Sequence, residues 1–208
     1  YKSKHRIGLK ILNKKFLLIL DQYDNSQINN LIFVLAFCIL NKINTNFIFK
    51  QKIKLPKIDG RGAIYKININ NINIQLIDQS YNANPETMIQ SIRNFSKINN
   101  KKYQTILILG EMNELGLDEL KFHYLVIKEI TQHMFDNVIL SGDLFKKALK
   151  MFPSFKNKFI YKSTSKGIMS YLEKNLHKKA MIMTKCSNAT EVNKFVTLLK
   201  LEKKDKIV

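Results

Sequence analysis

The sequence predicts an α/β protein in which a mostly parallel, Rossmann-like sheet carries helices on both of its faces. From Gly60 onward, short apolar segments typical of strands alternate with longer segments of helical periodicity. Strands that alternate with helices of about ten or more residues require crossover connections, which place successive strands parallel. Pro56 and Gly60 interrupt the chain before this pattern begins. We therefore expect a domain boundary there, with one part at residues 1–59 and a second domain at residues 60–208.

The first part is expected to contain a pair of strands and a helix. Residues 7–12 and 16–20 alternate in the manner of strands, with a turn at residues 13–15. Residues 26–41 follow candidate capping residues and are apolar on most sides, which predicts a buried helix.

The second part is expected to begin with two antiparallel strands joined at Asn70 and Asn71. Asn84 is a good N-cap residue, and Pro85 suits the first position of a helix. The predicted strands lie at 63–69, 72–78, 104–109, 137–141, 158–161 and 180–184, and the predicted helices at 85–98, 117–134, 143–152, 165–176 and 189–200.

The formal charge of +19 at first suggests a partner such as nucleic acid. However, Arg6, Arg61 and Arg93 are the only arginines among 35 basic residues. Sequence-specific readers of nucleic acid depend on the bidentate guanidinium group, so the composition argues against this class. A lysine-, asparagine- and isoleucine-rich composition is also what an AT-rich coding sequence produces.

Cysteine usage and hydropathy indicate a cytoplasmic protein. Cys38 and Cys186 show no CxxC spacing, which suggests a reducing compartment and no zinc site. The apolar run at residues 31–40 is too short to span a bilayer, and no signal peptide is visible. Because the chain begins with Tyr1 inside a strand-like pattern, we expect that an N-terminal part of the protein is missing from it.

Three motifs follow one another along the chain: GRG at residues 60–62, DQSYNANP at 78–85 and LGEMNELG at 109–116. The second motif joins a strand to a helix N-terminus, the place where open α/β sheets hold ligands. In this order the three motifs resemble the signature of the Mur ligases, and most closely the branch that adds D-alanyl-D-alanine to UDP-N-acetylmuramoyl-tripeptide. The resemblance covers roughly residues 7 to 200.

This resemblance implies an ATP-dependent ligase of peptidoglycan precursor synthesis. In that family an acyl phosphate forms on the tripeptide carboxylate, and the amine of D-alanyl-D-alanine attacks it. Residues 60–208 would then be the C-terminal domain of the ligase, and residues 1–59 the end of its central ATP-binding domain.

The resemblance also implies residues that contact ATP. Arg61 would reach the phosphates, although an interdomain salt bridge is the alternative for this arginine. Gln79 stands where relatives hold the ribose with an aspartate, and Asp78 is the neighbouring candidate. The remaining candidates are Tyr81 and Ala83 against adenine, Asn82 in the turn, and Asn29 or Asn30 at an adenine-contacting position where helix capping is the alternative.

The third motif and a later loop would bind the incoming dipeptide. Glu111 and Asn113 lie in the former, and Lys185, Ser187 and Asn188 lie in the latter. Relatives have a glycine at the position of Cys186 and an arginine at that of Asn188. His123 matches a histidine common in the branch, but as a single histidine on a helix it is a weak candidate for catalysis.

The 208 residues contain no GxxxxGK[ST] phosphate loop. We therefore expect the phosphate loop and the Mg²⁺ ligands in the missing N-terminal and central domains. The chain alone is expected to lack ligase activity, and no catalytic residue or metal site is assigned in it. Two other functions remain open from the residues: a degenerate, non-catalytic binding module, and a basic nucleic-acid-binding domain.

Overall fold

A computed structural model describes residues 5–20, 25–45, 59–98 and 102–202. The chain forms two compact units, residues 1–57 and 58–208. Each unit has its own sheet, of two strands in the first and six in the second.

The first unit contains strands β1 (His5–Ile11) and β2 (Lys14–Leu20) and helix α1 (Asn25–Leu40). The strands pair antiparallel with Ile11 opposite Lys14, so the turn consists of residues 12 and 13. The predicted turn at 13–15 was therefore wrong, because Lys14 and Lys15 already belong to β2. A positive φ of 52° at Leu12 makes this tight turn possible.

The prediction that α1 is buried was also wrong for this unit. Leu35 is buried, whereas Phe33, Phe37 and Leu40 are 74%, 63% and 71% exposed. Two strands offer only enough surface to cover one side of a helix, so the opposite side stays accessible. Among the described residues, no helix combines the length and apolar character that a bilayer crossing requires.

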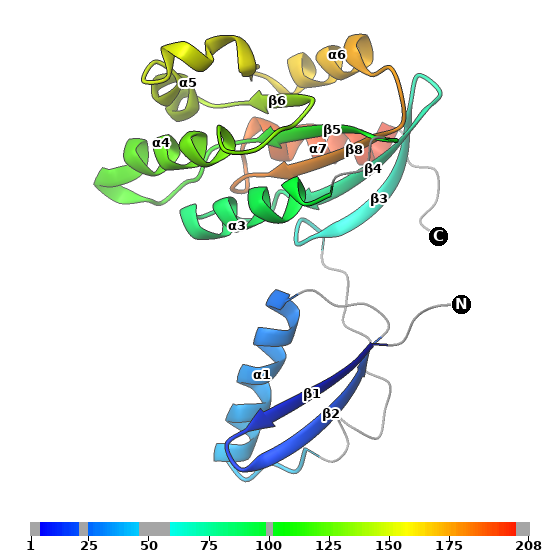
Figure 1. Ribbon diagram of the computed structural model, residues 1–208, viewed down its shortest axis with the longest axis vertical. Coiled ribbons are helices and arrows are strands. Elements are labelled where there is room, and N and C mark those ends of the chain that lie inside the picture. The colour runs from blue at the N-terminus through cyan, green and yellow to red at the C-terminus, as the bar shows by residue number, and fades with distance from the viewer. Residues whose placement is uncertain (1–4, 21–24, 46–58, 99–101, 203–208) are drawn as a thin grey trace. The chain divides into compact units, whose positions relative to one another are not determined.

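The second unit is built on a six-stranded sheet with the order β3–β4–β8–β5–β6–β7. Only β3 runs antiparallel to its neighbour; the other neighbouring strands pair in parallel, which confirms the predicted sheet. β8 lies between β4 and β5 although it comes last in the chain (Figure 1). The strands span Ala63–Ile69 (β3), Ile72–Gln79 (β4), Gln104–Leu109 (β5), Asn137–Leu140 (β6), Ile160–Tyr161 (β7) and Ala180–Lys185 (β8).

Helices cover both faces of this sheet, as the sequence predicted. Alternate residues of β5 separate the two cores: Leu107 and Leu109 face one helical layer, and Ile106 and Ile108 face the other. Figure 1 shows the two layers on opposite sides of the strands. The first layer holds α3 (Pro85–Ser96), α4 (Glu119–Ile130) and α5 (Asp143–Leu149), and the second holds α6 (Ser165–Asn175) and α7 (Glu191–Glu202).

Several predicted helix boundaries differ from the structure, and the helix predicted at 85–98 ends at Ser96. The segment 117–134 divides into a 3₁₀ turn, η1 (Gly116–Asp118), and α4, which ends at Ile130. The segment 143–152 stops at Leu149, and a second 3₁₀ turn, η2 (Pro153–Lys158), begins at a proline that cannot extend an α-helix. Ala189 has a positive φ of 60°, which keeps it outside α7.

The predicted start of α3 is confirmed. The Asn84 side chain accepts a hydrogen bond from the Thr87 amide at 2.8 Å, and the Thr87 hydroxyl accepts one from the Asn84 amide at 3.3 Å. This reciprocal capping box satisfies two backbone donors that a helix leaves unpaired, and Pro85 follows at the first helical position. The capping box therefore holds the turn after β4 in place at the point where it enters α3.

We predict that residues 58–208 fold without the first unit, because their sheet is complete and both of its faces are covered. The isolated segment should unfold in one cooperative thermal transition, followed by circular dichroism in the far and near ultraviolet. Residues 1–57 alone, with a core built around Leu18 and Ile28, should show no such transition. A protease-sensitive 58–208 segment without a cooperative transition would contradict the boundary.

Candidate functional site

The carboxyl ends of β4, β8, β5 and β6 lie at one edge of the sheet, because these four strands are parallel. The chain leaves β4 into α3 on one face and leaves β8 into α7 on the other face. Adjacent strands whose connections diverge in this way open a crevice between them, which is the usual ligand site of such sheets. The motifs that the sequence analysis singled out therefore meet at one place in the fold.

Asp78 lies at the centre of this edge and is completely buried. Its carboxylate accepts hydrogen bonds from the Gly60 amide at 3.1 Å, the Ser80 amide at 3.0 Å and the Ser80 hydroxyl at 2.6 Å. The ammonium group of Lys200 forms an ion pair with the same carboxylate. Asp78, a candidate ribose ligand in the sequence, is thus engaged inside the protein.

The loop at residues 59–62, hereafter the junction loop, carries Arg61 next to Tyr81. The guanidinium carbon lies 4.7 Å from the centroid of the Tyr81 ring, and the ring is 49% exposed. Gly60 accepts a hydrogen bond from the Tyr81 amide at 3.2 Å, and a Cβ atom on Gly60 would lie 2.7 Å from that of Tyr81. Only glycine fits this approach, and its φ of 73° favours glycine further.

Gln79 points to the opposite side of β4 from Asp78, as neighbouring residues of a strand do. Its side-chain oxygen accepts a hydrogen bond from the Ser91 hydroxyl of α3 at 2.6 Å. The acceptor atom that would face a ribose hydroxyl is therefore bonded within the protein. Sequence reasoning did not identify Ser91, because the contact depends on how α3 packs against β4.

The turn after β4 exposes Asn82 and buries Ala83 in the core beneath α3 and α4. The backbone carbonyl groups of both residues accept hydrogen bonds from the loop that follows β8. Lys185 donates to Asn82 at 3.1 Å, and the Ser187 hydroxyl donates to Ala83 at 3.5 Å. Two residues predicted to bind the incoming dipeptide thus connect the two loops to each other.

Lys185 is only 5% exposed, although its side chain is cationic in water. Burial lowers its pKa to about 8. With this pKa the lysine is mainly protonated at pH 7, and its amine can donate the hydrogen bond to Asn82 in either protonation state.

Glu111, Asn113 and Ser187 connect the loop after β5 with the loop after β8. The Asn113 amide donates to the Ser187 hydroxyl at 2.9 Å, and the Ser187 amide donates to the Glu111 carbonyl at 2.9 Å. The Glu111 carboxylate accepts from the Leu144 amide at 2.6 Å, at the start of α5.

A hollow of about 220 Å³ opens beside these loops, and two of its lining residues are acidic. Carboxylates and hydroxyls lining a hollow suit an ammonium group better than a carboxylate. Asn188 is exposed next to it, and its side chain accepts from the Ala189 amide at 3.0 Å. The residues that line the hollow are Glu111, Asn113, Ser141, Gly142, Ala189, Thr190 and Glu191.

Cys186, which stands where relatives have glycine, is buried beneath the turn after β4. Its thiol lies 3.7 Å from the Ser80 carbonyl oxygen, and burial raises its pKa to about 12. The thiol is therefore protonated at neutral pH and acts as a small packing group. A Cβ atom on Gly110 would lie 2.7 Å from that of Cys186, so this cysteine requires a glycine opposite it.

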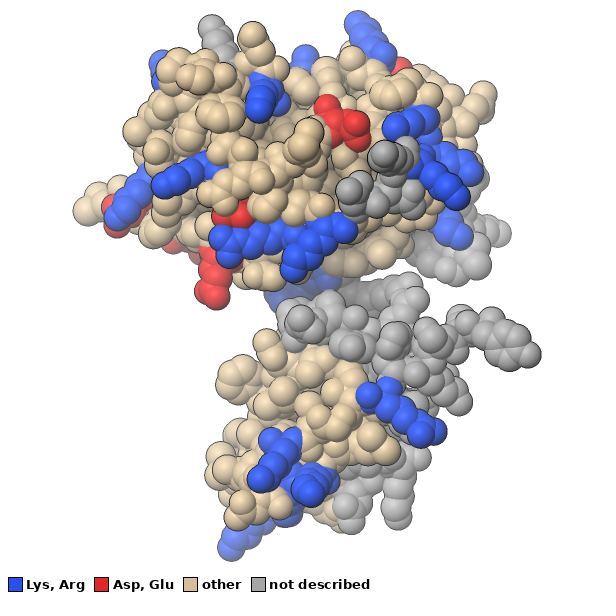
Figure 2. Space-filling view, in the orientation of Figure 1, with Lys and Arg blue, Asp and Glu red and all other residues tan. Residues whose placement is uncertain are grey.

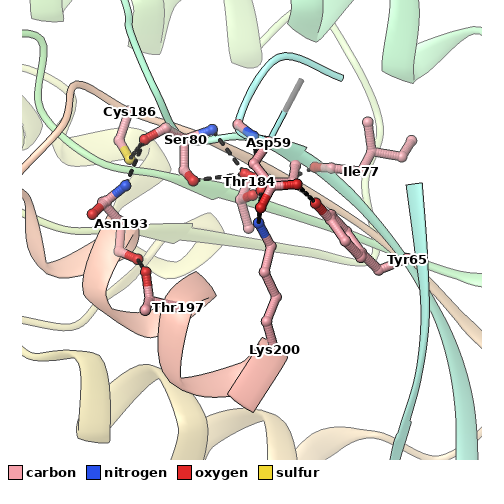
Figure 3. A network of polar contacts seen from close by, with 11 residues as sticks. Asp59, Tyr65, Ile77, Ser80, Thr184, Cys186, Asn193, Thr197 and Lys200 are labelled. Atoms are coloured by element: carbon pink, nitrogen blue, oxygen red, sulfur yellow. Dashed lines mark hydrogen bonds and ion pairs between the residues drawn. The ribbon is translucent and has the colours of Figure 1, made fainter. Parts of the chain in front are cut away.

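Two further residues support this edge, and the sequence analysis missed both. Asn193 of α7 donates a side-chain hydrogen bond to the Ser80 carbonyl at 2.8 Å, and Lys200 pairs with Asp78 (Figure 3). Lys200 follows the buried residues Val192, Val196 and Leu199 at helical spacing. A lysine on the apolar face of a helix was the signal that could have identified it.

Two of the predicted nucleotide contacts belong to the first unit. Asn29 and Asn30 are exposed in the first turns of α1, in the other unit. Within the described residues, no three His, Cys, Asp or Glu side chains gather as a metal site would require. On the face drawn in Figure 2, the basic side chains lie in several separate groups.

His123 is buried, and both nitrogens of its imidazole ring are engaged. Nε2 accepts from the Met112 amide at 3.1 Å, so Nδ1 carries the proton and donates to the Glu119 carbonyl at 2.7 Å. The ring also packs edge-on against Phe145 with centroids 4.7 Å apart. His123 therefore supports the loop after β5.

Comparison with known proteins gives both sequence and structural relatives. No family model matches the chain. The chain is 29% identical over 131 residues, 63% of its length, to the UDP-N-acetylmuramoyl-tripeptide–D-alanyl-D-alanine ligase of Buchnera aphidicola, and this region is 28% of that protein.

Two solved structures share the fold of almost the whole chain. A crystal structure of MurF from Acinetobacter baumannii superposes with a TM-score of 0.74 at 17% identity, covering 96% of this chain and 43% of that one. MurF ligase from Thermotoga maritima, in complex with ADP, gives 0.69 at 20% identity, covering 97% and 44%. The chain thus spans less than half the length of these relatives.

We predict that His123 loses its proton at a lower pH than an ordinary histidine, because burial lowers its pKa. Since the pKa in the folded state lies below that in the unfolded state, stability is lost as the pH falls below about 6.5. Long-range ¹H–¹⁵N spectra across pH 5 to 8 should show an Nδ1–H tautomer that does not titrate near pH 6.5. An Nε2–H tautomer, or a midpoint at or above that value, would contradict the assigned role.

Proposed function

We propose that this chain belongs to the Mur ligase family and forms the C-terminal part of an ATP-dependent ligase. The ligase joins D-alanyl-D-alanine to UDP-N-acetylmuramoyl-tripeptide in peptidoglycan precursor synthesis, in the cytoplasm. Residues 60–208 are its C-terminal domain, and residues 1–59 are the end of its central ATP-binding domain. The observation that carries the proposal is the meeting of all three motif loops at one edge of the sheet.

The nucleotide is bound at the junction loop and the turn after β4. The exposed ring of Tyr81 offers a surface on which adenine can stack, and the Arg61 guanidinium beside it carries the charge that phosphate oxygens attract. Asn82 is exposed next to the ring, and the backbone of Ala83 shapes the turn. These features fit an aromatic ligand that carries anionic groups.

The other residues predicted to contact the nucleotide are either hydrogen-bonded within this unit or belong to the first unit. Gln79 can reach a ribose hydroxyl only if its bond to Ser91 is given up or shared. Asn29 and Asn30 belong to the first unit, where both are exposed, and the site proposed in the second unit does not include them. Asp78 acts through Ser80 and Gly60 instead of touching the nucleotide.

The dipeptide is bound at the hollow between the loops that follow β5, β6 and β8. The carboxylate of Glu111 lies at its wall and suits the ammonium group of D-alanyl-D-alanine. Asn113 and Asn188 provide polar groups at the rim, and Lys185 and Ser187 fix the loop that carries Asn188. This arrangement positions the amine that becomes the new amide nitrogen.

ATP supplies the phosphoryl group that activates the tripeptide carboxylate, and that step needs a phosphate loop and Mg²⁺ ligands. We place both in the N-terminal and central domains of the intact ligase, which are the partners of this chain. The 208 residues alone therefore bind ligands without turnover. Nucleic acid is not a partner in this proposal.

The proposal predicts that the 208-residue chain binds ADP weakly, with a Kd of about 0.1–1 mM, and that binding changes little with salt. Arg61→Met should weaken binding about tenfold because it removes the cation beside Tyr81. Arg6→Met, which removes an exposed arginine of the first unit, should leave it unchanged. Competition against a fluorescent ADP analogue, followed by polarisation at 50 and 300 mM salt, measures all three proteins.

Two outcomes would contradict the proposal. Equal weakening by Arg61→Met and Arg6→Met, or binding that collapses with salt, would indicate nonspecific attraction of a polyanion to the basic surface. The degenerate-module alternative is favoured by the engagement of Gln79 and Lys185 within the protein. An intact protein that binds ADP but releases no phosphate with both substrates present would establish that alternative.

A further inference from the structure

We propose that Lys200, far from the motifs in sequence, is a positioning residue for the nucleotide side of this site. Paired with Asp78, it holds the junction loop against the turn after β4, and so keeps Arg61 beside Tyr81. This inference rests on the proposed function for its link to nucleotide binding. Its structural part, the dependence of the loop on Lys200, stands independently of that function.

Lys200 lies in the last turn of α7 and extends towards the end of β4. Its side chain is 15% exposed and Asp78 is fully buried, so water screens their attraction little. The ammonium group also lies 4.4 Å from the centroid of the Tyr65 ring and 3.8 Å from a carboxylate oxygen of Asp59. Figure 3 shows the lysine reaching this group of side chains from below the sheet edge.

A cation is needed here because the Asp78 side chain is completely buried. The Gly60 amide, the Ser80 amide and the Ser80 hydroxyl all donate to Asp78. A charge buried with hydrogen bonds alone remains costly, and a paired cation offsets that cost. Burial alone lowers the pKa of Lys200, but its interactions with Asp78 and Tyr65 together raise it more, so the lysine is protonated at neutral pH.

The same contacts connect Lys200 to the ligand-facing residues. Asp78 binds Gly60, and the carbonyl of Gly60 in turn accepts from the Tyr81 amide at 3.2 Å. The Asp78 carbonyl accepts from the Gly62 amide at 2.7 Å, so both glycines that flank Arg61 are attached to Asp78. The Tyr65 hydroxyl donates to Asp59 at the start of the loop.

Lys200 itself touches none of the residues proposed to face the nucleotide. Its influence must pass through Asp78 and Asp59 to the junction loop. If the pair only stabilised the fold, its loss would weaken the whole domain evenly. If the pair positions the loop, removing the pair should increase amide exchange first at residues 60–62 and 80–81. Amide exchange resolves these two cases residue by residue.

The test compares Lys200→Met with Lys200→Arg in the full 208-residue chain. Lys200→Met keeps most of the side-chain volume and removes the charge, and Lys200→Arg keeps the charge. Lys194→Met is the matched control, because Lys194 lies on the same helix in an exposed pair with Glu191. The readouts are hydrogen exchange of individual amides by NMR and the affinity for ADP.

We expect Lys200→Met to accelerate exchange at Gly60, Gly62, Ser80 and Tyr81 by about tenfold or more, with the amides of β5 and β8 little changed. ADP affinity should fall about five- to tenfold. Lys200→Arg should restore both readouts to within about threefold, and Lys194→Met should change neither. Should Lys200→Met not fold, the pair Asp78→Asn with Lys200→Met removes both charges and is expected to fold with the same local loss of protection.

The outcomes separate this inference from the proposed function. A folded Lys200→Met protein with unchanged exchange at the junction loop would overturn the role of Lys200, even if the wild type binds ADP. Exchange that rises evenly over the whole sheet would overturn it too. A wild-type chain that does not bind ADP would overturn the proposed function, whereas the exchange comparison would still decide whether Lys200 holds the loop.

Discussion

The ion pair between the buried carboxylate of Asp78 and Lys200 is the interaction on which the organisation of this site depends. Hydrogen bonds from Gly60 and Ser80 converge on the same carboxylate, so one side chain joins the start of the unit, the end of β4 and the last turn of α7. A carboxylate without exposure cannot exchange these partners for water at low cost. The backbone at Gly60 and Ser80 is therefore held in place. The side chains of the adjacent residues, Arg61 and Tyr81, then point in defined directions.

The residues at this edge of the sheet fall into a buried set and an exposed set. Asp78, Ala83, Cys186 and Ser187 are buried and are bonded or packed within the protein, whereas Arg61, Tyr81, Asn82 and Asn188 face outward. The loops after β4, β5 and β8 are also joined to one another through Lys185 and Ser187. A displacement of the turn after β4 would therefore also displace the loop after β8, beside the hollow. Such a frame suits the proposed reaction, which must align an acyl phosphate with an attacking amine.

Local patterns in the sequence were sufficient for most of the fold. Alternating apolar residues located the strands, Asn84 with Pro85 located the start of α3, and the motif order indicated the family. The errors have two sources, local turns and tertiary contacts. The boundaries of α4 and α5 depend on short-range turns, and the exposure of α1 depends on how little sheet its unit provides. The direction of Gln79 and the partner of Asp78 come from helices far along the chain, which no local pattern encodes.

The central claim is that the ends of β4, β5 and β8 form one site with a nucleotide side and a dipeptide side. Titration of the ¹⁵N-labelled chain with ADP and with D-alanyl-D-alanine, followed by amide chemical shifts, tests it most directly. The account predicts that ADP shifts the amides of residues 60–62 and 80–84, and that the dipeptide shifts those of residues 111–113 and 187–191. Shifts spread over lysine-rich helix surfaces, and abolished by salt, would contradict it.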